Sequence, residues 1–277
     1  IDPLYVACLI DNRIPSVDDF FEEDGLCFRT ILSQVISSEL DVDRMDYLER
    51  DAFFCGTSYG KVETSWLLSN LTYHINSSHG NNLHLALNRR ALYTFDDFLL
   101  SRHHMHLMVY FHHKSIIYEE MLLRYLTSKD CQFFLPADID QYIKYTDYYL
   151  YEHLASVDNK WAQRIAKQNP YKMLFEFHST EKTNRLPQMK QVLEEKGIHC
   201  ILSNSTTRLS KYHSGSLGES ERSIFVVDQY DKQANPYPIE KSTEIFHKYE
   251  EIRRIERIYV DPQHFMEAQT IIEENKL

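Results

Sequence analysis

Glycine is scarce in this sequence, with 7 residues among 277, while tyrosine and phenylalanine number 19 and 15. So little glycine excludes collagen-like and flexible low-complexity chains. A hydrophobic content of 43% also excludes an intrinsically disordered protein. The composition therefore predicts regular secondary structure with dense aromatic packing.

Cysteine is also sparse, and no two cysteines form a CxxC pair. The five residues are scattered: Cys8, Cys27, Cys55, Cys131 and Cys200. This pattern excludes a disulfide framework and a thiolate zinc site. We expect reduced, mostly packed thiols in a cytoplasmic protein. No window of eighteen apolar residues occurs, so the sequence predicts no membrane span.

Basic residues are outnumbered, 30 against 41 acidic ones, for a formal net charge of −11. This balance argues against an extended nucleic-acid surface, which needs clustered Lys and Arg. It leaves room for a small phosphate pocket, because a few buried cations can dominate locally. The first residues have neither an initiator Met nor a basic leader, and we expect the chain to start within a longer protein.

Apolar spacing predicts a mostly helical first part. Residues 25–56 have helical periodicity, and Ser38 with Asp41 three residues later resembles a capping box with the shorter acid. Gly56 is the expected helix stop. Residues 83–87 alternate as a brief strand does. One long amphipathic helix is expected from Phe95 to about Leu126.

The pattern changes near Asn169, where we place a domain boundary. Residues 1–169 are expected to form a helical domain and residues 170–277 a smaller α/β or α+β module. Ser203–Ser223 is expected to be a loop. Helices are expected at Tyr142–Leu154, Asn159–Gln168, Pro187–Lys196 and about Pro262–Glu274, and strands at Lys172–Phe177, Ile198–Leu202, Ser223–Val227 and Ile255–Val260.

The segment LDVDRMDYLERD, residues 40–51, is the most informative. Asp43, Tyr47 and Asp51 are spaced i, i+4 and i+8, so they project from one face of a helix. Two carboxylates flanking a phenol can hold a metal at one end and bind hydroxyls at the other. Arg44 lies beside this stripe and can turn toward phosphate.

Spacing alone leaves an ordinary explanation open for that segment. Charge runs usually form a solvated helix face, here with a salt bridge between Asp46 and Arg50.

A second stripe consists of Arg102, His106 and Tyr110, again at i, i+4 and i+8. A guanidinium, an imidazole and a phenol in line suit a polyphosphate next to a sugar. His103 with His106 is a His-x-x-His pair without a carboxylate, which is weak support for a metal. A helix whose His and Tyr side chains satisfy buried hydrogen bonds explains the same residues.

Residues 37–56, SSELDVDRMDYLERDAFFCG, resemble the second signature of HD-domain deoxynucleoside triphosphate triphosphohydrolases, a helix of the form D-x-D-[RK]-x-D-Y-x-x-R-D. The resemblance implies that Asp43 is the last metal ligand and that Arg44 lies near the phosphates. It further implies that Tyr47 and Asp51 bind the deoxyribose 3′-hydroxyl.

The family's downstream Arg, His and Tyr match Arg102, His106 and Tyr110. They imply a pocket-lining helix with Tyr110 close to the sugar. The resemblance also implies the fold class, a mainly α HD-domain core, here incomplete, followed by the smaller α/β or α+β module.

One family feature is missing. No His-Asp dipeptide occurs, and no His precedes Asp43. The other metal ligands and the catalytic His would therefore lie upstream of Ile1. One carboxylate does not hold a divalent metal by itself, so the chain alone is expected to be inactive, with no catalytic residue of its own. The metal, whether Mg, Mn, Fe, Zn or Ni, is not specified by the sequence.

The implied reaction is metal-dependent hydrolysis of deoxynucleoside triphosphates to deoxynucleoside and triphosphate. The family also implies a nucleotide effector and a homo-oligomer, a dimer or tetramer. A non-catalytic nucleotide-binding regulatory protein is the alternative, and it predicts a parent without a His-Asp pair. A plain interaction module is the third reading, and it predicts no thermal shift with any deoxynucleotide.

Overall fold

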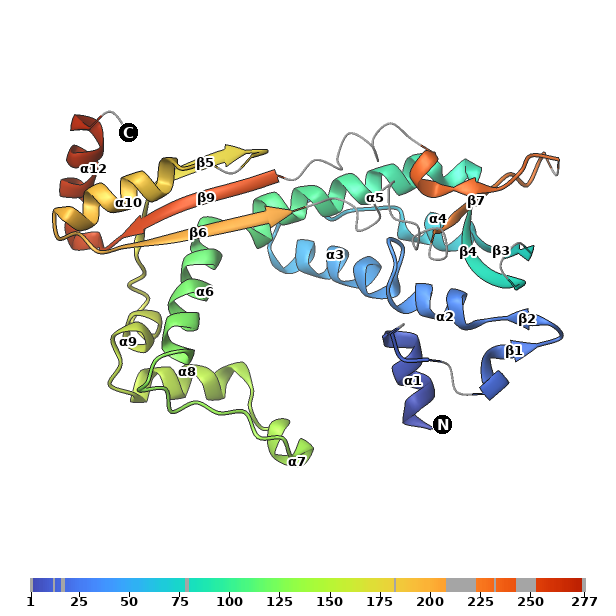
Figure 1. Ribbon diagram of the computed structural model, residues 1–277, viewed down its shortest axis with the longest axis horizontal. Coiled ribbons are helices and arrows are strands. Elements are labelled where there is room, and N and C mark those ends of the chain that lie inside the picture. Colours follow the sequence, from blue (N-terminus) through green and yellow to red (C-terminus); the bar gives the residue numbers. More distant parts are fainter. Residues whose placement is uncertain are drawn as a thin grey trace. The chain divides into compact units, whose positions relative to one another are not determined.

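The computed structural model describes residues 2–11, 13–15, 18–77, 80–181, 183–207, 223–231, 233–242 and 253–275. The chain forms two compact units, each assembled from two stretches of sequence. The first unit comprises Ile1–Val109 and Arg208–Glu251, and the second comprises Tyr110–Thr207 and Ile252–Leu277 (Figure 1). Among the described residues, no helix combines the length and apolar character needed to cross a membrane.

Among its described residues, the first unit combines α-helices with a mixed sheet. The helices are α1 (Pro3–Ile10), α2 (Arg29–Ile36), α3 (Val42–Phe54), α4 (Thr64–Ser69) and α5 (Leu92–Met105). The strands are β1 (Glu22–Glu23), β2 (Leu26–Cys27), β3 (Leu71–Asn76), β4 (Asn82–Asn88), β7 (Phe225–Val227) and β8 (Tyr237–Pro238).

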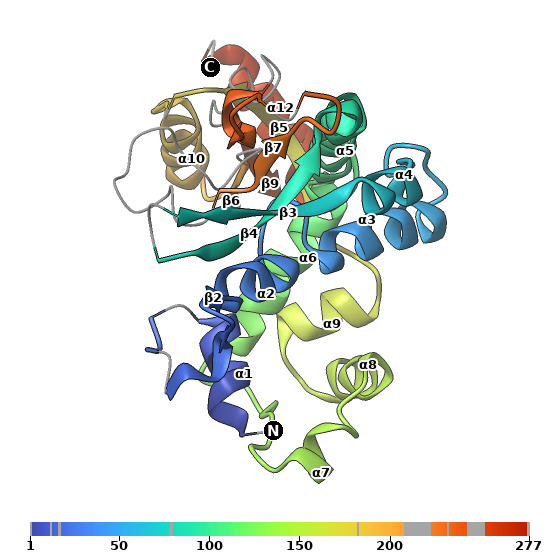
Figure 2. The same ribbon diagram turned by 90° about the vertical axis from the view of Figure 1, so that its right-hand side faces the viewer.

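β4 is the centre of this sheet and confirms the strand expected at residues 83–87. Residues 82–87 of β4 pair antiparallel with the whole of β3, and β4 also pairs parallel with β2 and β7. α2 packs against β4 (Figure 2). Gln34, which is 3% exposed, fixes that packing, because its amide accepts from Leu85 N at 2.7 Å and donates to Ser223 O at 3.1 Å.

α3 begins and ends where local sequence signals place it. Asp41 is the N-cap, accepting a hydrogen bond from Arg44 N at 2.8 Å, and its other oxygen accepts from Ser38 N at 3.1 Å. The Ser38/Asp41 signal thus marks the start of α3, with Asp41 rather than Ser38 as the cap. Gly56, at φ +65°, follows the last turn, as a helix stop does.

The second unit joins helices to a three-stranded sheet. Its helices are α6 (His113–Leu126), α7 (Ile139–Tyr142), α8 (Asp147–Ser156), α9 (Lys160–Ala166), α10 (Arg185–Glu195) and α12 (Phe265–Glu274). β5 (Lys172–Ser179) and β6 (Cys200–Thr207) both pair antiparallel with β9 (Arg253–Val260), which lies between them. β5 and β6 are therefore parallel, and β5–α10–β6 is a split βαβ unit.

Each face of this sheet is covered by helices. On one face, Leu193 and Met189 of α10 pack with Ile258 and with Ala268 of α12. On the other, Tyr259 packs with residues of α6, α8 and α9, among them Met121, Leu154 and Trp161. The predicted class, a mainly helical core followed by a smaller α/β module, is confirmed.

The long helix expected from Phe95 to Leu126 is wrong as a single element. α5 ends at Met105, a π-helix runs over His106–Tyr110, and α6 begins at His113. His112 caps α6, and Arg257 and Tyr259 of β9 donate to the carbonyls of Phe111 and His113 at 2.7 and 3.0 Å. The sequence around this break contains no Gly or Pro that would signal it. The break is stabilised by side chains of β9, which are distant in sequence.

Strand pairing also departs from the expected grouping of the C-terminal residues. The strand expected at Ser223–Val227 is β7, and it pairs with β4 in the sheet of the first unit. Asn169, where the boundary was predicted, lies in the sequence range of the second unit. Residues 203–207 of the expected loop belong to β6, and its residues 208–222 lie outside the described residues.

The five cysteines are all free thiols, as the sequence indicated. Cys8 and Cys200 are buried, and only Cys55 is exposed. Burial raises the pKa of the Cys200 thiol to about 11, so this side chain behaves as a packed apolar group at neutral pH.

Candidate functional site

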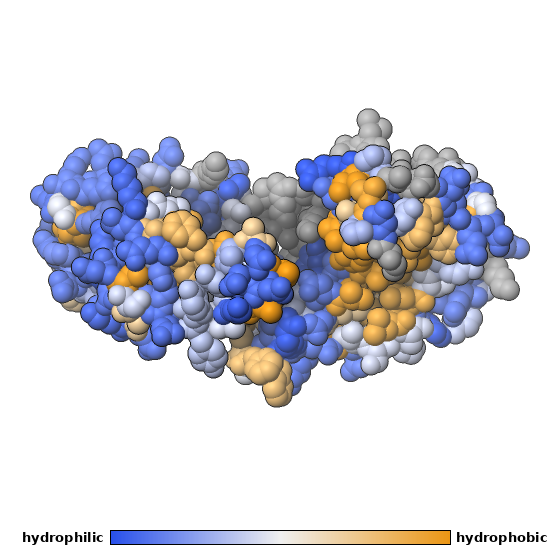
Figure 3. All heavy atoms as spheres, turned by 90° about the horizontal axis from the view of Figure 1, so that it is seen from below, coloured by the Kyte–Doolittle hydropathy of each residue, from blue (hydrophilic) through white to orange (hydrophobic). Residues whose placement is uncertain are grey.

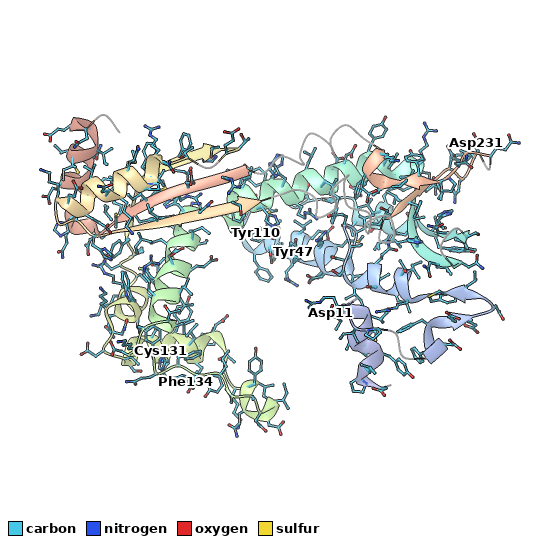
Figure 4. All side chains as sticks on the ribbon, in the orientation of Figure 1. Asp11, Tyr47, Tyr110, Cys131, Phe134 and Asp231 are labelled. Atoms are coloured by element: carbon cyan, nitrogen blue, oxygen red, sulfur yellow. The ribbon has the colours of Figure 1, made fainter. Side chains whose placement is uncertain are left out.

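α3 presents the residues of the first motif in two classes of environment. Asp43 lies exposed in the first turn, while Tyr47 and Asp51 are half-buried one and two turns further on. Figure 4 labels Tyr47. Arg44, on the same helix, is only 9% exposed. Part of the ordinary explanation also holds, because Asp46 and Arg50 form an exposed salt bridge.

A buried carboxylate joins the two motifs. Glu39, which is wholly buried, accepts hydrogen bonds through one oxygen from Arg44 Nη1 at 2.9 Å and from Arg102 Nη1 at 2.6 Å. Arg44 Nε also lies 3.5 Å from Asp41 Oδ2. The end of α5 and the start of α3, about sixty residues apart in sequence, are therefore joined through ionic hydrogen bonds.

The two arginines retain donors beyond this network. Arg44 and Arg102 are 9% and 6% exposed. Within the described part of the chain, no hydrogen bond occupies Nη2 of Arg44 or Nε and Nη2 of Arg102. A phosphate group can accept hydrogen bonds from several of these guanidinium N–H donors at once.

Tyr47 and His106 belong to the same electrostatic cluster. Burial raises the pKa of the Tyr47 phenol, and the charges of Arg102 and Arg44 act against that shift. Burial likewise lowers the pKa of His106, and both arginines lower it further. The structure thus brings together Arg44, Tyr47, Arg102 and His106 within one unit.

His106 has a defined tautomer when neutral. Its Nδ1 lies 2.9 Å from the carbonyl oxygen of Arg102, which can only accept, so Nδ1 carries the proton. The acceptor lone pair of the neutral ring is then on Nε2. A neutral imidazole at neutral pH suits a group that accepts a proton or a hydrogen bond.

Tyr110 is placed differently from the rest of the second motif. Arg102 lies in α5, whereas His106 and Tyr110 are the first and last residues of the π-helix. A π-helix bonds residues i and i+5, so the expected α-helical stripe through all three residues is wrong. Tyr110 is half-buried and is the first residue of the second unit.

The fit to a divalent metal is incomplete. Asp43 offers one exposed carboxylate. Across the residues that the structure describes, no group of three or more His, Cys, Asp or Glu side chains is arranged to hold a metal ion. One carboxylate is too few for a divalent site, so no chemical step through a metal follows from the described residues.

Glu39 is the site residue that the sequence analysis did not single out. Glu39 lies within residues 37–56, the segment that resembles the family signature. It lies between α2 and α3, so no helical spacing relates it to the other site residues. Its partner Arg102 is 63 residues away. The role of this buried acid becomes visible only when the fold pairs it with both arginines.

Comparison with known proteins gives a family match over the middle of the chain. Residues 72–200 match the family model described as HD associated region. This range includes Arg102, His106 and Tyr110, whereas α3 with Asp43 and Tyr47 precedes it. The match relates the chain to HD-domain proteins.

Sequence relatives cover parts of the chain. Uncharacterized protein MG461 of Mycoplasma genitalium is 36% identical over 119 residues, 43% of this chain and 25% of its own length. Uncharacterized protein MJ1154 of Methanocaldococcus jannaschii is 28% identical over 149 residues, 54% of this chain and 32% of its own. The matched region therefore spans a third or less of these relatives.

Two solved structures share the fold. A hypothetical protein from Aquifex aeolicus aligns with a TM-score of 0.73 at 22% identity, over 98% of this chain and 65% of its own. A phosphohydrolase from Bacteroides thetaiotaomicron aligns with a TM-score of 0.56 at 19% identity, over 83% of this chain and 63% of its own. The chain spans under two thirds of either structure, and these likenesses concern the fold.

Histidine burial predicts a pH-dependent stability. The pKa values of His74, His106 and His113 are all lowered, chiefly by burial, from an ordinary value of 6.5. The unfolded chain therefore binds more protons, and the stabilisation is complete above pH 6.5 and is lost as the pH falls through the lowered values. Urea unfolding at pH 7.5 and 5.5 should show a lower unfolding free energy at pH 5.5.

A single-residue control isolates the contribution of His106. The His106→Gln variant should lose less stability between pH 7.5 and 5.5 than the wild type, because one titrating group is gone. Equal losses in both proteins would mean that His106 titrates normally.

Proposed function

We propose that the protein containing this chain hydrolyses deoxynucleoside triphosphates to deoxynucleoside and inorganic triphosphate. The observation that carries the proposal is the pair of buried arginines, Arg44 and Arg102, which retain donors and lie with Tyr47 and His106. The HD-domain relation and a fold shared with a phosphohydrolase support a hydrolase.

In the proposed reaction, water attacks the α-phosphorus and the bond from that phosphorus to the 5′-oxygen breaks. The 5′-oxygen leaves with a proton as the deoxynucleoside, and the water oxygen stays in the triphosphate. Arg44 and Arg102 offset negative charge on the phosphate oxygens. Tyr47 and Asp51 bind the 3′-hydroxyl, and His106 accepts a hydrogen bond or proton at Nε2.

Asp43 is proposed as one ligand of a divalent metal whose remaining ligands lie outside the described residues. Its position supports this role, because it is exposed in the first turn of α3, one turn from Tyr47. When bound, such a metal would supply charge neutralisation at the phosphates. The metal, a nucleotide effector and a homo-oligomeric state remain parts of the proposal.

The test is product analysis on the longest natural protein that contains this chain. Each of the four dNTPs, alone and in mixtures, is incubated with Mg²⁺ or Mn²⁺ and separated by anion exchange. Deoxynucleoside plus intact triphosphate supports the proposal. Deoxynucleoside monophosphate plus pyrophosphate, or no turnover in any mixture, contradicts it and favours a nucleotide-binding regulator.

Tyr110 supplies a prediction about sugar selection. The family resemblance implies that the Tyr110 phenol lies close to the sugar, where it would exclude a 2′-hydroxyl. Tyr110→Ala should then raise kcat/KM for ribonucleoside triphosphates about tenfold relative to deoxynucleotides. Competition assays with paired dNTP and NTP substrates measure that ratio. Tyr148→Ala, which removes an 86% exposed tyrosine of the second unit, is the control and should leave the ratio unchanged, and an unchanged ratio in Tyr110→Ala would remove this role.

A further inference from the structure

We propose that Glu39 is the positioning residue of the phosphate-binding site, holding Arg44 and Arg102 in register and setting the net charge of the pair. The inference rests on the proposed function and adds a residue to it. Glu39 touches neither phosphate nor metal in this account. It acts through the two guanidinium groups.

The geometry fixes the orientation of both arginines. One oxygen of Glu39 takes Nη1 of each, at 2.9 and 2.6 Å. A planar guanidinium held at Nη1 presents its remaining donors in a fixed direction. Arg44 comes from α3 and Arg102 from the last turn of α5, so the shared carboxylate keeps the donor edges of two helices in one relative position.

Alternative partners at this place are limited by burial. Glu39 has no exposed surface, and Asp41 is only 5% exposed. Asp41 is also occupied, since it caps α3 at Arg44 N and takes Ser38 N. Glu39 is therefore the acid that bridges the two arginines, while Asp41 serves the start of α3.

The charges of this group cancel. Glu39 and Asp41 offset Arg44 and Arg102, which gives a net charge of zero for the four side chains. A polyphosphate therefore meets directed N–H donors without a strong local excess of positive charge. The low net charge limits the attraction of the site for a free polyphosphate, which favours release of the highly charged triphosphate product.

This distinction predicts opposite changes in binding and in turnover. Glu39→Gln keeps the shape of the side chain but adds one unit of positive charge to the group. Affinity of the chain for inorganic triphosphate should rise roughly tenfold and become more salt-dependent. In the longer protein, kcat should fall at least tenfold while KM falls or stays level, because the guanidinium groups are held less firmly.

Titration calorimetry with inorganic triphosphate at 50 and 300 mM NaCl measures the first effect. The matched control is Asp46→Asn, which removes an acid from the exposed pair with Arg50 on the same helix and should leave affinity within twofold. Weaker triphosphate binding in Glu39→Gln, or equal changes in both variants, overturns the proposal. A merely structural role would lower the active fraction without raising affinity.

A second readout does not depend on any ligand. In arginine side-chain NMR, restrained Hη signals of two arginines should be present in the wild type and disappear in Arg44→Lys and Arg102→Lys, one in each. Both signals should broaden in Glu39→Gln. Glu39→Asp keeps the charge on a shorter side chain, so at least one restrained arginine signal should persist in it. This variant replaces Glu39→Gln in the comparison if Glu39→Gln does not fold.

These measurements separate the two proposals. In one outcome, the wild type shows no dNTP turnover while its arginine signals depend on Glu39 and triphosphate binding changes as predicted. That combination removes the proposed function and leaves the role of Glu39. Arginine signals that are unaffected in both Glu39 variants remove the role of Glu39, whatever the substrate.

Discussion

The Asp43→Ala variant of the longer protein is expected to lose dNTP hydrolysis by at least a thousandfold, an order-of-magnitude figure for removal of a metal ligand. The reason is that Asp43 is proposed to complete the metal site. The chain should remain folded, because Asp43 is exposed and the cap of α3 is supplied by Asp41. Loss of an acid from the first turn costs the helix only about 0.3–1 kcal/mol.

Hydrolysis and metal content measured on the same samples check this expectation. Asp46→Ala is the matched control, since Asp46 is an exposed acid on the same helix whose partner is Arg50. It should retain near wild-type turnover and metal content. Full activity in Asp43→Ala would remove Asp43 from the ligand set and leave it as part of a solvated helix face.

The largest effect on folding is expected at Gly60. A Cβ at this position would lie 2.3 Å from the carbonyl oxygen of Leu48 and 2.8 Å from the Cβ of Ala52, both on α3. The chain after α3 must therefore touch the helix closely, and only glycine allows that approach. Gly60→Ala should lower the unfolding free energy by about 3 kcal/mol.

Thermal unfolding of the chain measures this effect, with an expected fall in Tm of roughly 6–12 °C. Ser58→Ala, an exposed position two residues earlier, should shift Tm by less than about 2 °C. Because the clash falls on the helix that carries Asp43 and Tyr47, Gly60→Ala should also weaken triphosphate binding. A Tm equal to that of the wild type would show that this loop moves away from α3 without cost.

Local signals in the sequence predicted the helix that carries the first motif. The Asp41 cap and the stop at Gly56 are interactions between near neighbours, so residues 41–56 specify them without help from the rest of the chain. The alternation at residues 83–87 likewise predicted the strand β4, although both faces of this strand are buried, His84 included. The ends of α3 were readable because their causes are local.

Distant contacts determine what the sequence did not reveal. The break between α5 and α6 is held by Arg257 and Tyr259, each 146 residues from the carbonyl that it binds. The residues around it have helical propensity and no Gly or Pro, so a continuous helix was the natural prediction. The pairing of β7 with β4 is equally non-local.

The sequence predicted the two sets of residues in the candidate site, but it did not predict how the two sets contact each other. The resemblance chose Arg44, Tyr47, Arg102 and His106, and the structure places them in one electrostatic cluster. The carboxylate that joins them, Glu39, required the fold. Tyr110 was expected on the same helical face, which the π-helix rules out.

Apolar side chains on the first unit also have no counterpart in the sequence analysis. Figure 3 shows them gathered over α1 and α2, where exposed residues include Val6, Ile10, Leu32, Val35 and Ile36. Exposed groups of this kind commonly mark contact surfaces. Binding and activity assays on this chain should therefore include a check of its aggregation state.

The most direct test of the central claim is hydrolysis of a dNTP by the longer protein in ¹⁸O-labelled water. Phosphorus NMR and mass spectrometry then locate the label among the products. Attack at the α-phosphorus predicts one ¹⁸O in the released triphosphate and none in the deoxynucleoside. Label in the deoxynucleoside, or labelled monophosphate or pyrophosphate in place of triphosphate, would contradict the account.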